Sequence, residues 1–191
     1  MLIGIDIDGV LLNTSYEIID FLNQKYNKTI RINDLTSPNW WELFKISRNE
    51  IIRDFNEFVC SSAGENQKPV FGAVDSVFKL SKKYDLISIS AREEKLRKIT
   101  DKLIFEIFDG NIKQTFYTGG FSNDFSKKSK GALAKKLGVE IFIDDNLHEV
   151  FDCSNYKINS YLLDYPYNQG KLSENIVRVF SWRDLISKLI N

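Results

Sequence analysis

Residues 2–14 read LIGIDIDGVLLNT, and this stretch indicates both the fold and the place of a site. Its first four residues are apolar and mostly branched or long, as in a short buried strand. Asp6 and Asp8 follow at once, and side chains two residues apart on an extended chain point to the same side. Two neighbouring carboxylates repel each other unless a cation or a chemical task keeps them together. An acidic turn explains such a pair equally well, because Asp and Gly are common in turns.

The composition predicts a globular protein with a sizeable core. The chain has 191 residues, 43% of them hydrophobic, and its 26 basic residues balance 26 acidic ones. This balance argues against a general nucleic-acid-binding protein. Cys60 and Cys153 are far apart and His148 is the only histidine, which argues against a zinc site and a disulfide framework. Without a signal-peptide pattern or a bilayer-length apolar run, we expect a soluble cytoplasmic protein with no membrane partner. A homodimer is left open.

Strand and helix patterns alternate along most of the chain. After the first strand, the strand patterns cover residues 86–89, 113–118, 140–143, 160–163 and 177–180. Between them, residues 69–84 indicate a loop and a helix, and helix patterns cover residues 93–108 and 128–137. A further short helix precedes the strand at 160–163, and a last one begins at about Ser181. This alternation predicts an α/β fold, a Rossmann-like three-layer arrangement with a parallel sheet and helices on both faces.

Residues 15–70 have a different character and predict a small helical cap inserted after the first strand. A helix pattern runs to about Tyr26, and Thr14 and Glu17 have the spacing of a capping box at its start. A second helix pattern covers residues 47–59, where Ser47 and Glu50 have the same spacing. We expect the core domain to consist of residues 1–14 and 71–191.

Polar residues follow three of the predicted strands. Asp6 and Asp8 follow the first, Ser90-Ala91-Arg92 follow the second, and Asp144-Asp145 follow a third. Since ligands bind beyond the carboxyl ends of strands in such sheets, we expect these groups to converge at one edge. Lys130, at the start of a helix, would add a positive charge there. Its neighbours Lys127 and Lys128 are interpreted as a solvated helix start.

The carboxylates of Asp6, Asp8, Asp144 and Asp145 predict a magnesium site. Mg²⁺ prefers oxygen ligands and typically binds through one or two carboxylates and substrate phosphate. Zinc or copper would be expected to recruit His or Cys. His148 lies four residues beyond Asp144 and is interpreted as a surface residue of a helix.

Asp6-Ile7-Asp8-Gly9-Val10, the strand-terminal Ser90, Lys130 and Asp144-Asp145 resemble motifs one to four of the haloacid-dehalogenase-like phosphohydrolases. The resemblance covers most of the chain outside residues 15–70, where this family places its smaller cap. It implies that Asp6 is the nucleophile that forms an aspartyl-phosphate, and that Asp8 is the general acid and then the base. Motif two more often has Thr than Ser, and Ser88 is a competing choice that lies inside the strand.

The same resemblance implies roles for the remaining motif residues. Ser90 would donate a hydrogen bond to a phosphoryl oxygen, and Lys130 with Mg²⁺ would neutralise the transferring group. Asp6, the backbone carbonyl of Asp8 and Asp144 would hold Mg²⁺, with Asp145 contributing directly or through water. Family members that remove halide lack a second acid at the position of Asp8, and transport ATPases have Thr there. Asp8 therefore indicates a phosphatase or a phosphomutase.

Short segments are similar to the 5'(3')-deoxyribonucleotidase branch of the family. They are residues 71–74 (FGAV), 164–168 (DYPYN), 178–179 (RV) and 181–182 (SW). This similarity implies a nucleoside monophosphate substrate, specifically a deoxynucleoside monophosphate, whose base stacks on cap aromatics. Trp40, Trp41 and Phe44 are candidates for the stacking, and packing within the cap is the alternative for all three.

The remaining predictions concern the substrate site. Gly9, Ala91 and Arg92 are expected beside the substrate, where Arg92 contacts a phosphate or a ribose hydroxyl; a salt-bridged surface position is its alternative. Two other functions stay open. One is a phosphatase or phosphomutase for another small phosphorylated metabolite, and the other is a catalytically silent binding protein with the same fold.

Overall fold

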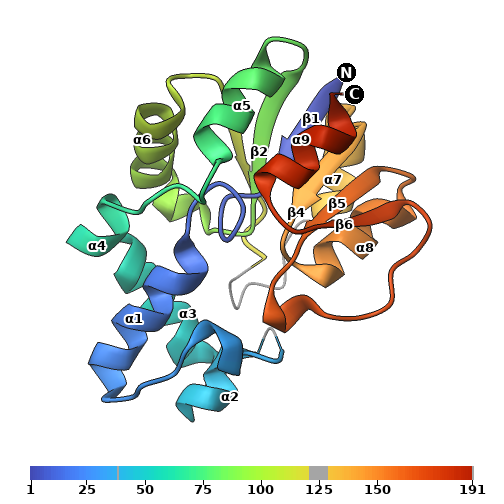
Figure 1. The fold of residues 1–191 in the computed structure, drawn as a ribbon. Helices are drawn as coiled ribbons and strands as arrows, with labels where there is room; N and C mark the ends of the chain where they lie inside the picture. Colours follow the sequence, from blue (N-terminus) through green and yellow to red (C-terminus); the bar gives the residue numbers. More distant parts are fainter. Residues whose placement is uncertain (38, 121–128, 191) are drawn as a thin grey trace.

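A six-stranded parallel sheet forms the centre of the molecule (Figure 1). The computed structural model describes residues 1–37, 39–120 and 129–190. The strand order is β3-β2-β1-β4-β5-β6. The strands are β1 (Leu2–Ile5), β2 (Asp85–Ser90), β3 (Thr115–Tyr117), β4 (Ile141–Asp144), β5 (Asn159–Leu163) and β6 (Ile176–Val179). The predicted α/β class and parallel sheet are confirmed.

Helices cover both faces of this sheet, which gives the predicted three layers (Figure 1). The helices of the core are α5 (Ala73–Ser81), α6 (Arg97–Phe108), α7 (Lys130–Leu137), α8 (Leu147–Asn155) and α9 (Trp182–Leu189). One apolar cluster joins α5, α6 and α9 to the face of the sheet that carries Ile3 and Ile5. A second joins α7 and α8 to the opposite face, which carries Phe142. The alternation of side chains along the strands therefore supplies a core on each face, and Val150, Leu162 and Ile176 form a third, smaller cluster.

The first strand lies between β2 and β4, so three carboxyl ends come side by side. Ile5 is in register with Ser88 on one side and with Ile143 on the other. Close packing beneath this edge needs a glycine, because a Cβ on Gly4 would come within 2.8 Å of the Phe142 ring. From β1 the chain adds β2 and β3 on one side of the sheet and then β4, β5 and β6 on the other side. Ligands bind where the order of strands changes in this way, which here is between β1 and β4.

Among the described residues, four of the helices between β1 and β2 lie together on the side of the sheet where the carboxyl ends lie, at the position of the predicted cap (Figure 1). They are α1 (Thr14–Tyr26), α2 (Trp40–Phe44), α3 (Arg48–Val59) and α4 (Ser62–Glu65). Their apolar residues, among them Ile18, Phe55 and Phe58, belong to the same buried cluster as one face of the sheet. The cap is thus packed continuously onto the core through burial of apolar surface.

The expected capping box at Ser47 and Glu50 is confirmed, whereas the one at Thr14 and Glu17 is wrong. Ser47 Oγ accepts from the Glu50 amide at 3.2 Å, and the Glu50 carboxylate accepts from the Ser47 amide at 2.8 Å. Thr14 instead begins α1, and its hydroxyl donates to Asp8 at 2.7 Å. Glu17 accepts from the amide of Lys68 at 2.9 Å. Both residues of this pair face the junction between cap and core.

The helices α5, α6, α7 and α9 lie within a few residues of their predicted places. Ser129 and Ser181 cap α7 and α9 through their hydroxyls. The predicted positions Lys127 and Lys128 lie outside the described residues. The described residues also contain three short 3₁₀ turns, at Ile32–Asp34, Glu94–Leu96 and Pro166–Asn168. In the part of the chain that the structure describes, no helix combines the length and apolarity that a membrane span requires.

Candidate active site

The carboxyl ends of the central strands bring the predicted residues together. Asp6 directly follows β1, and its amide donates to the carbonyl of Ile143 in β4 at 2.8 Å. Ser90 and Asp144 are the last residues of β2 and β4. All three side chains are buried. The expected convergence at one edge of the sheet is what the structure has.

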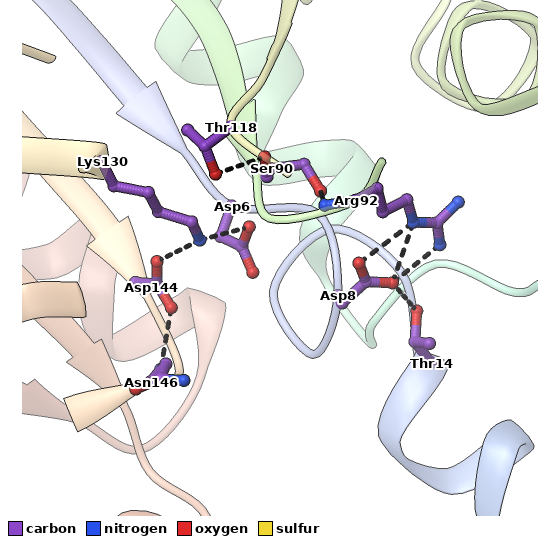
Figure 2. Close-up of polar contacts among 9 residues, drawn as sticks. All are labelled: Asp6, Asp8, Thr14, Ser90, Arg92, Thr118, Lys130, Asp144 and Asn146. Atoms are coloured by element: carbon purple, nitrogen blue, oxygen red, sulfur yellow. Dashed lines mark hydrogen bonds and ion pairs between the residues drawn. The ribbon is translucent and has the colours of Figure 1, made fainter. Parts of the chain in front are cut away.

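Lys130 connects two of these carboxylates (Figure 2). Its Nζ donates to Asp6 Oδ1 and to Asp144 Oδ2, both at 2.7 Å, and its side chain is only 3% exposed. Burial opposes the positive charge, but Asp144 and Asp6 outweigh it and hold the pKa of Lys130 well above its usual range. Lys130 therefore remains an ammonium that cross-links the ends of β1 and β4.

The start of α7 fixes the direction of Lys130. Ser129 donates to the carboxylate of Asp152 in α8 at 2.6 Å, and the amide of Gly131 donates to the same carboxylate at 2.7 Å. A Cβ at Gly131 would lie 2.6 Å from the carbonyl oxygen of Asp152. The two helices can approach this closely because residue 131 is a glycine, and Lys130 is then aimed at the sheet edge.

Three buried carboxylates gather around this lysine. Each of Asp6, Asp144 and Asp145 offers an oxygen within 4.8 Å of the others. Burial raises the pKa of Asp6 to about 7, against the pull of Lys130 and with the help of the charges on Asp144 and Asp8. Burial, then the charges of Asp144 and Asp6, raises the pKa of Asp145 well above its usual range. Three carboxylates against one ammonium form a site that lacks positive charge, and its oxygen atoms suit a hard divalent cation.

Aromatic residues near the end of the chain orient Asp145. Its Oδ2 accepts a hydrogen bond from the Tyr167 hydroxyl, which lies 2.9 Å from Ser15 Oγ in α1. Asn168 donates to the carbonyl of Asp145 at 2.7 Å. Gly9 has φ of 79°, and a Cβ there would come within 2.2 Å of the same Oδ2. The glycine of the first motif therefore makes room for Asp145, and it does not line the cavity.

Asp8 lies on the other side of Asp6 and pairs with Arg92 (Figure 2). Arg92 Nη2 donates to Asp8 Oδ1 at 2.7 Å, and Nε donates to Oδ2 at 3.0 Å. Arg92 is 1% exposed, and its Nη1 donates to Thr100 in α6 at 3.0 Å. The alternative that Arg92 is a salt-bridged surface residue is wrong, because its partner is the second carboxylate of the motif and both groups lie inside the site.

The loop after β2 also borders Asp6. Ser90 Oγ accepts from the amide of Arg92 at 3.2 Å, and the Ser90 carbonyl accepts from the amide and hydroxyl of Thr118 (Figure 2). The hydroxyl of Ser88, the competing choice, donates to Thr115 in β3 at 3.0 Å inside the sheet. Ser90 is thus the serine at the strand end, and Ala91 after it lines the cavity.

A cavity of about 290 Å³ opens above these groups, between the sheet edge and the cap. Asp6, Asp8 and Lys130 form its floor, and Trp40 and Trp41 belong to its cap side. Trp40 contacts Tyr167, with ring centroids 5.9 Å apart. Phe44 is 2% exposed, packs against Tyr26 and does not line the cavity, so its assignment to base stacking is wrong. It belongs to the core of the cap.

His148 is exposed on α8 as predicted, and it also lines the cavity wall. Sequence reasoning missed three residues that contact the site. Thr14 donates to Asp8, Gln67 accepts from Arg92, and Thr118 donates to the Ser90 carbonyl. Thr14 had the signature of a helix cap, and Gln67 lay in a polar loop without a pattern of its own. Tyr167 and Asn168 were inside a quoted segment, but nothing in the sequence tied them to Asp145.

Known proteins resemble this chain in sequence and in fold. A protein of Clostridium acetobutylicum named nucleotidase is 26% identical over 186 residues, which cover 96% of this chain and 90% of that protein. A haloacid dehalogenase-like hydrolase of Streptococcus pneumoniae has a TM-score of 0.69 at 13% identity, covering 98% of this chain and 97% of the other. The chain therefore shares its fold with haloacid dehalogenase-like hydrolases and is similar in sequence to a protein named nucleotidase. This agrees with the resemblance of its four motifs and with the predicted class of enzyme, a hydrolase of phosphoric monoesters.

A further solved structure is similar in fold. A HAD-hydrolase of Bacillus subtilis, described as bound to magnesium, has a TM-score of 0.63 at 14% identity, covering 100% of this chain and 98% of the other. No family model matches the chain. The fold is therefore shared with hydrolases, and the substrate has to be argued from the cavity.

Proposed function

We propose that the chain is a magnesium-dependent phosphomonoesterase that forms an aspartyl-phosphate on Asp6 and acts on nucleoside monophosphates. The arrangement of Lys130 between Asp6 and Asp144, with Asp8 on the opposite side of Asp6, carries this proposal. It supplies a nucleophile, a fixed positive charge and a separate group for proton transfer at one cavity floor. The proposal includes a cap of residues 15–70 and a cytoplasmic location.

Asp6 attacks phosphorus in the first step. Lys130 binds Asp6 Oδ1, so the second oxygen of Asp6 is the one that faces an incoming phosphoryl group. As the new bond to phosphorus forms, the bond to the leaving oxygen breaks, and Asp8 gives that oxygen a proton. In the second step Asp8 takes a proton from water, whose oxygen bonds to phosphorus and releases Asp6 and inorganic phosphate.

The residues present fit a magnesium ion. Asp6, Asp144 and the backbone carbonyl of Asp8 would hold it, and Asp145, oriented by Tyr167, would bind directly or through water. When bound, Mg²⁺ supplies positive charge against the phosphoryl oxygens. The hydroxyl of Ser90 would offer a hydrogen bond to the same group.

The cavity and a relative support the nucleotide substrate. Trp40, Trp41 and Phe55 from the cap and Tyr167 from the core give the cavity an aromatic lining. A planar base stacks favourably on such rings. The volume of about 290 Å³ suits a small ligand. The relative from Clostridium acetobutylicum carries the name nucleotidase.

Phosphate release tests the proposal. The protein is assayed with Mg²⁺ against nucleoside monophosphates, sugar phosphates and p-nitrophenyl phosphate, and again after chelation. We expect release that chelation abolishes and Mg²⁺ restores, with the highest kcat/KM on a nucleoside monophosphate. A preference for sugar phosphates would contradict the nucleotide substrate, and activity in chelator would contradict the requirement for Mg²⁺. No phosphate release from any substrate would favour a catalytically silent binding protein.

A further inference from the structure

Four side chains form a closed ring of hydrogen bonds on the Asp8 side of the site. Arg92 Nη2 donates to Asp8 Oδ1 at 2.7 Å and to Gln67 Oε1 at 3.0 Å. Gln67 Nε2 donates to Thr14 Oγ1 at 2.8 Å, and Thr14 Oγ1 donates to Asp8 Oδ1 at 2.7 Å. Thr14, Gln67 and Arg92 are each at most 2% exposed. Buried polar groups in such a network hold one another in a single arrangement.

The chemistry of the donors fixes the direction of this ring. Arg92 can only donate, so the carbonyl oxygen of Gln67 must face it, and the amide nitrogen must face Thr14. Thr14 receives this donor and therefore directs its own hydrogen to Asp8. Arg92 and Thr14 both donate to the carboxylate, so Asp8 is the acceptor on which the ring closes.

The two oxygens of Asp8 are held very unequally. Oδ1 accepts from Thr14 at 2.7 Å, from Arg92 Nη2 at 2.7 Å and from Arg92 Nε at 3.2 Å. Among the described residues, Oδ2 accepts only from Arg92 Nε, at 3.0 Å. The Asp8 side chain is 24% exposed and lines the cavity. Oδ1 is the anchored atom, and Oδ2 keeps the capacity to bind a proton or a substrate oxygen.

The ring also sits where the chain crosses between core and cap. Thr14 begins α1, just after the outgoing crossing, and Gln67 precedes the returning one. The two crossings are paired, since Asn13 N donates to Lys68 O at 2.8 Å and Val70 N donates to Leu11 O at 3.0 Å. Asp8 is thereby attached to the base of the cap from both crossings.

We propose that Arg92 and Gln67 are positioning residues, which anchor Asp8 Oδ1 so that Oδ2 is the atom that exchanges the proton with substrate. This inference rests on the proposed function. In the first step the proton leaves Oδ2 for the leaving oxygen as the bond between that oxygen and phosphorus breaks. In the second step Oδ2 takes the proton from water while the bond from Asp6 to phosphorus breaks. The proposed role of Arg92 is exerted on Asp8, whose Oδ2 its Nε also contacts at 3.0 Å, and not on phosphorus or the leaving oxygen.

Gln67→Glu tests this with little change in shape. The new carboxylate accepts from both Arg92 and Thr14, so it competes for the two residues that anchor Asp8. The readout is kcat/KM with Mg²⁺ for p-nitrophenyl phosphate, which has a good leaving group, and for phenyl phosphate, which has a poor one. This ratio reports the steps up to release of the leaving group, where Asp8 acts as an acid.

Proton donation matters most for the poor leaving group. General acid catalysis contributes roughly 10²–10⁴-fold to the rate. Because Gln67→Glu disturbs the orientation of the Asp8 carboxyl group, we expect kcat/KM for phenyl phosphate to fall by about 10- to 100-fold. The loss for p-nitrophenyl phosphate is expected to stay below about threefold. Equal losses on both substrates, or no loss on either, would overturn the inference and leave the proposed function standing. Wild-type protein inactive on both would overturn both.

Arg92 variants provide the second measurement. Arg92→Gln is expected to show the same leaving-group dependence, and Arg92→Lys to restore part of the activity on phenyl phosphate, because it keeps the charge without the planar fork. Arg97→Gln is the matched control, since Arg97 is 42% exposed and pairs with Glu94 outside the cavity. If Arg92→Gln does not fold, Gln67→Glu still decides. Full activity on phenyl phosphate in a folded Arg92→Gln protein would refute the role of Arg92.

Discussion

The two sides of the active site each bury one cation, and they balance charge in different ways. On one side the Lys130 ammonium faces Asp6 and Asp144, with Asp145 in the same group of carboxylates. On the other side the Arg92 guanidinium faces Asp8 alone. The Lys130 side is short of positive charge and suits an added divalent cation. The Arg92 side is balanced, so its contacts hold one side chain in place.

Asp6→Asn should have the largest effect on activity, because it removes the proposed nucleophile. We expect kcat/KM for p-nitrophenyl phosphate to fall by about four orders of magnitude or more. Asp109→Asn is the control, since Asp109 is exposed after α6 in the left-handed conformation, which Asn tolerates well. A folded Asp6→Asn protein that keeps wild-type activity would contradict covalent catalysis.

Asp8→Asn should reduce activity less and should depend on the leaving group. We expect a loss of roughly 10²–10⁴-fold for phenyl phosphate, the size of general acid–base catalysis. The loss of kcat/KM for p-nitrophenyl phosphate should be smaller, because its leaving group needs little protonation. Steady-state kinetics on both substrates measures the difference. Equal losses would mean that Asp8 does not act as the acid.

Tyr167→Phe tests the Lys130 side without removing a carboxylate. The lost hydroxyl no longer orients Asp145, and partners of metal ligands typically contribute about 10- to 100-fold to metal affinity. We expect the Mg²⁺ concentration for half-maximal activity to rise about tenfold, with a small change in kcat at saturating Mg²⁺. An unchanged Mg²⁺ dependence would contradict a role of Tyr167 and Asp145 in binding the metal.

In the metal-free protein, Asp6→Asn and Asp8→Asn should change the melting temperature in opposite directions. Burial raises the pKa of Asp6 from 3.8 to about 7, so its stabilising contribution is present below about pH 4 and lost as the pH rises through about 7. Asp6→Asn should therefore melt a few degrees above wild type at pH 8, with a gap that narrows toward pH 5. Asp8→Asn should melt lower than wild type, because it leaves Arg92 buried without its carboxylate. Equal signs for the two variants would break the comparison.

The sequence predicted the Lys130 side well and the Arg92 side poorly. Asp6, Ser90 and Asp144 end strands of one parallel sheet, so the position in the chain already determines that they meet. Lys130 followed from its place at the start of a helix. These residues could be found because each is placed by an element whose pattern is visible in the sequence.

Arg92 and Gln67 are placed by contacts that no local pattern reports. Arg92 and Asp8 are 84 residues apart, and Gln67 and Thr14 are 53 apart. Thr14 had the spacing of a helix cap, but its hydroxyl donates to the Asp8 carboxylate instead of capping α1. Phe44 failed as a stacking residue for the same reason, because the fold of the cap turns it inward.

The most direct test of the central claim is to find the phosphoryl group on Asp6. Asp8→Asn protein is mixed with p-nitrophenyl phosphate and Mg²⁺ and quenched in acid, and its peptides are analysed by mass spectrometry. This substrate still transfers its phosphoryl group without acid assistance, whereas hydrolysis of the intermediate needs Asp8 as base, so the intermediate should accumulate. We predict one added phosphoryl group on the peptide that contains Asp6, and none in Asp6→Asn. Nitrophenol release with no phosphoryl group on that peptide would contradict the account.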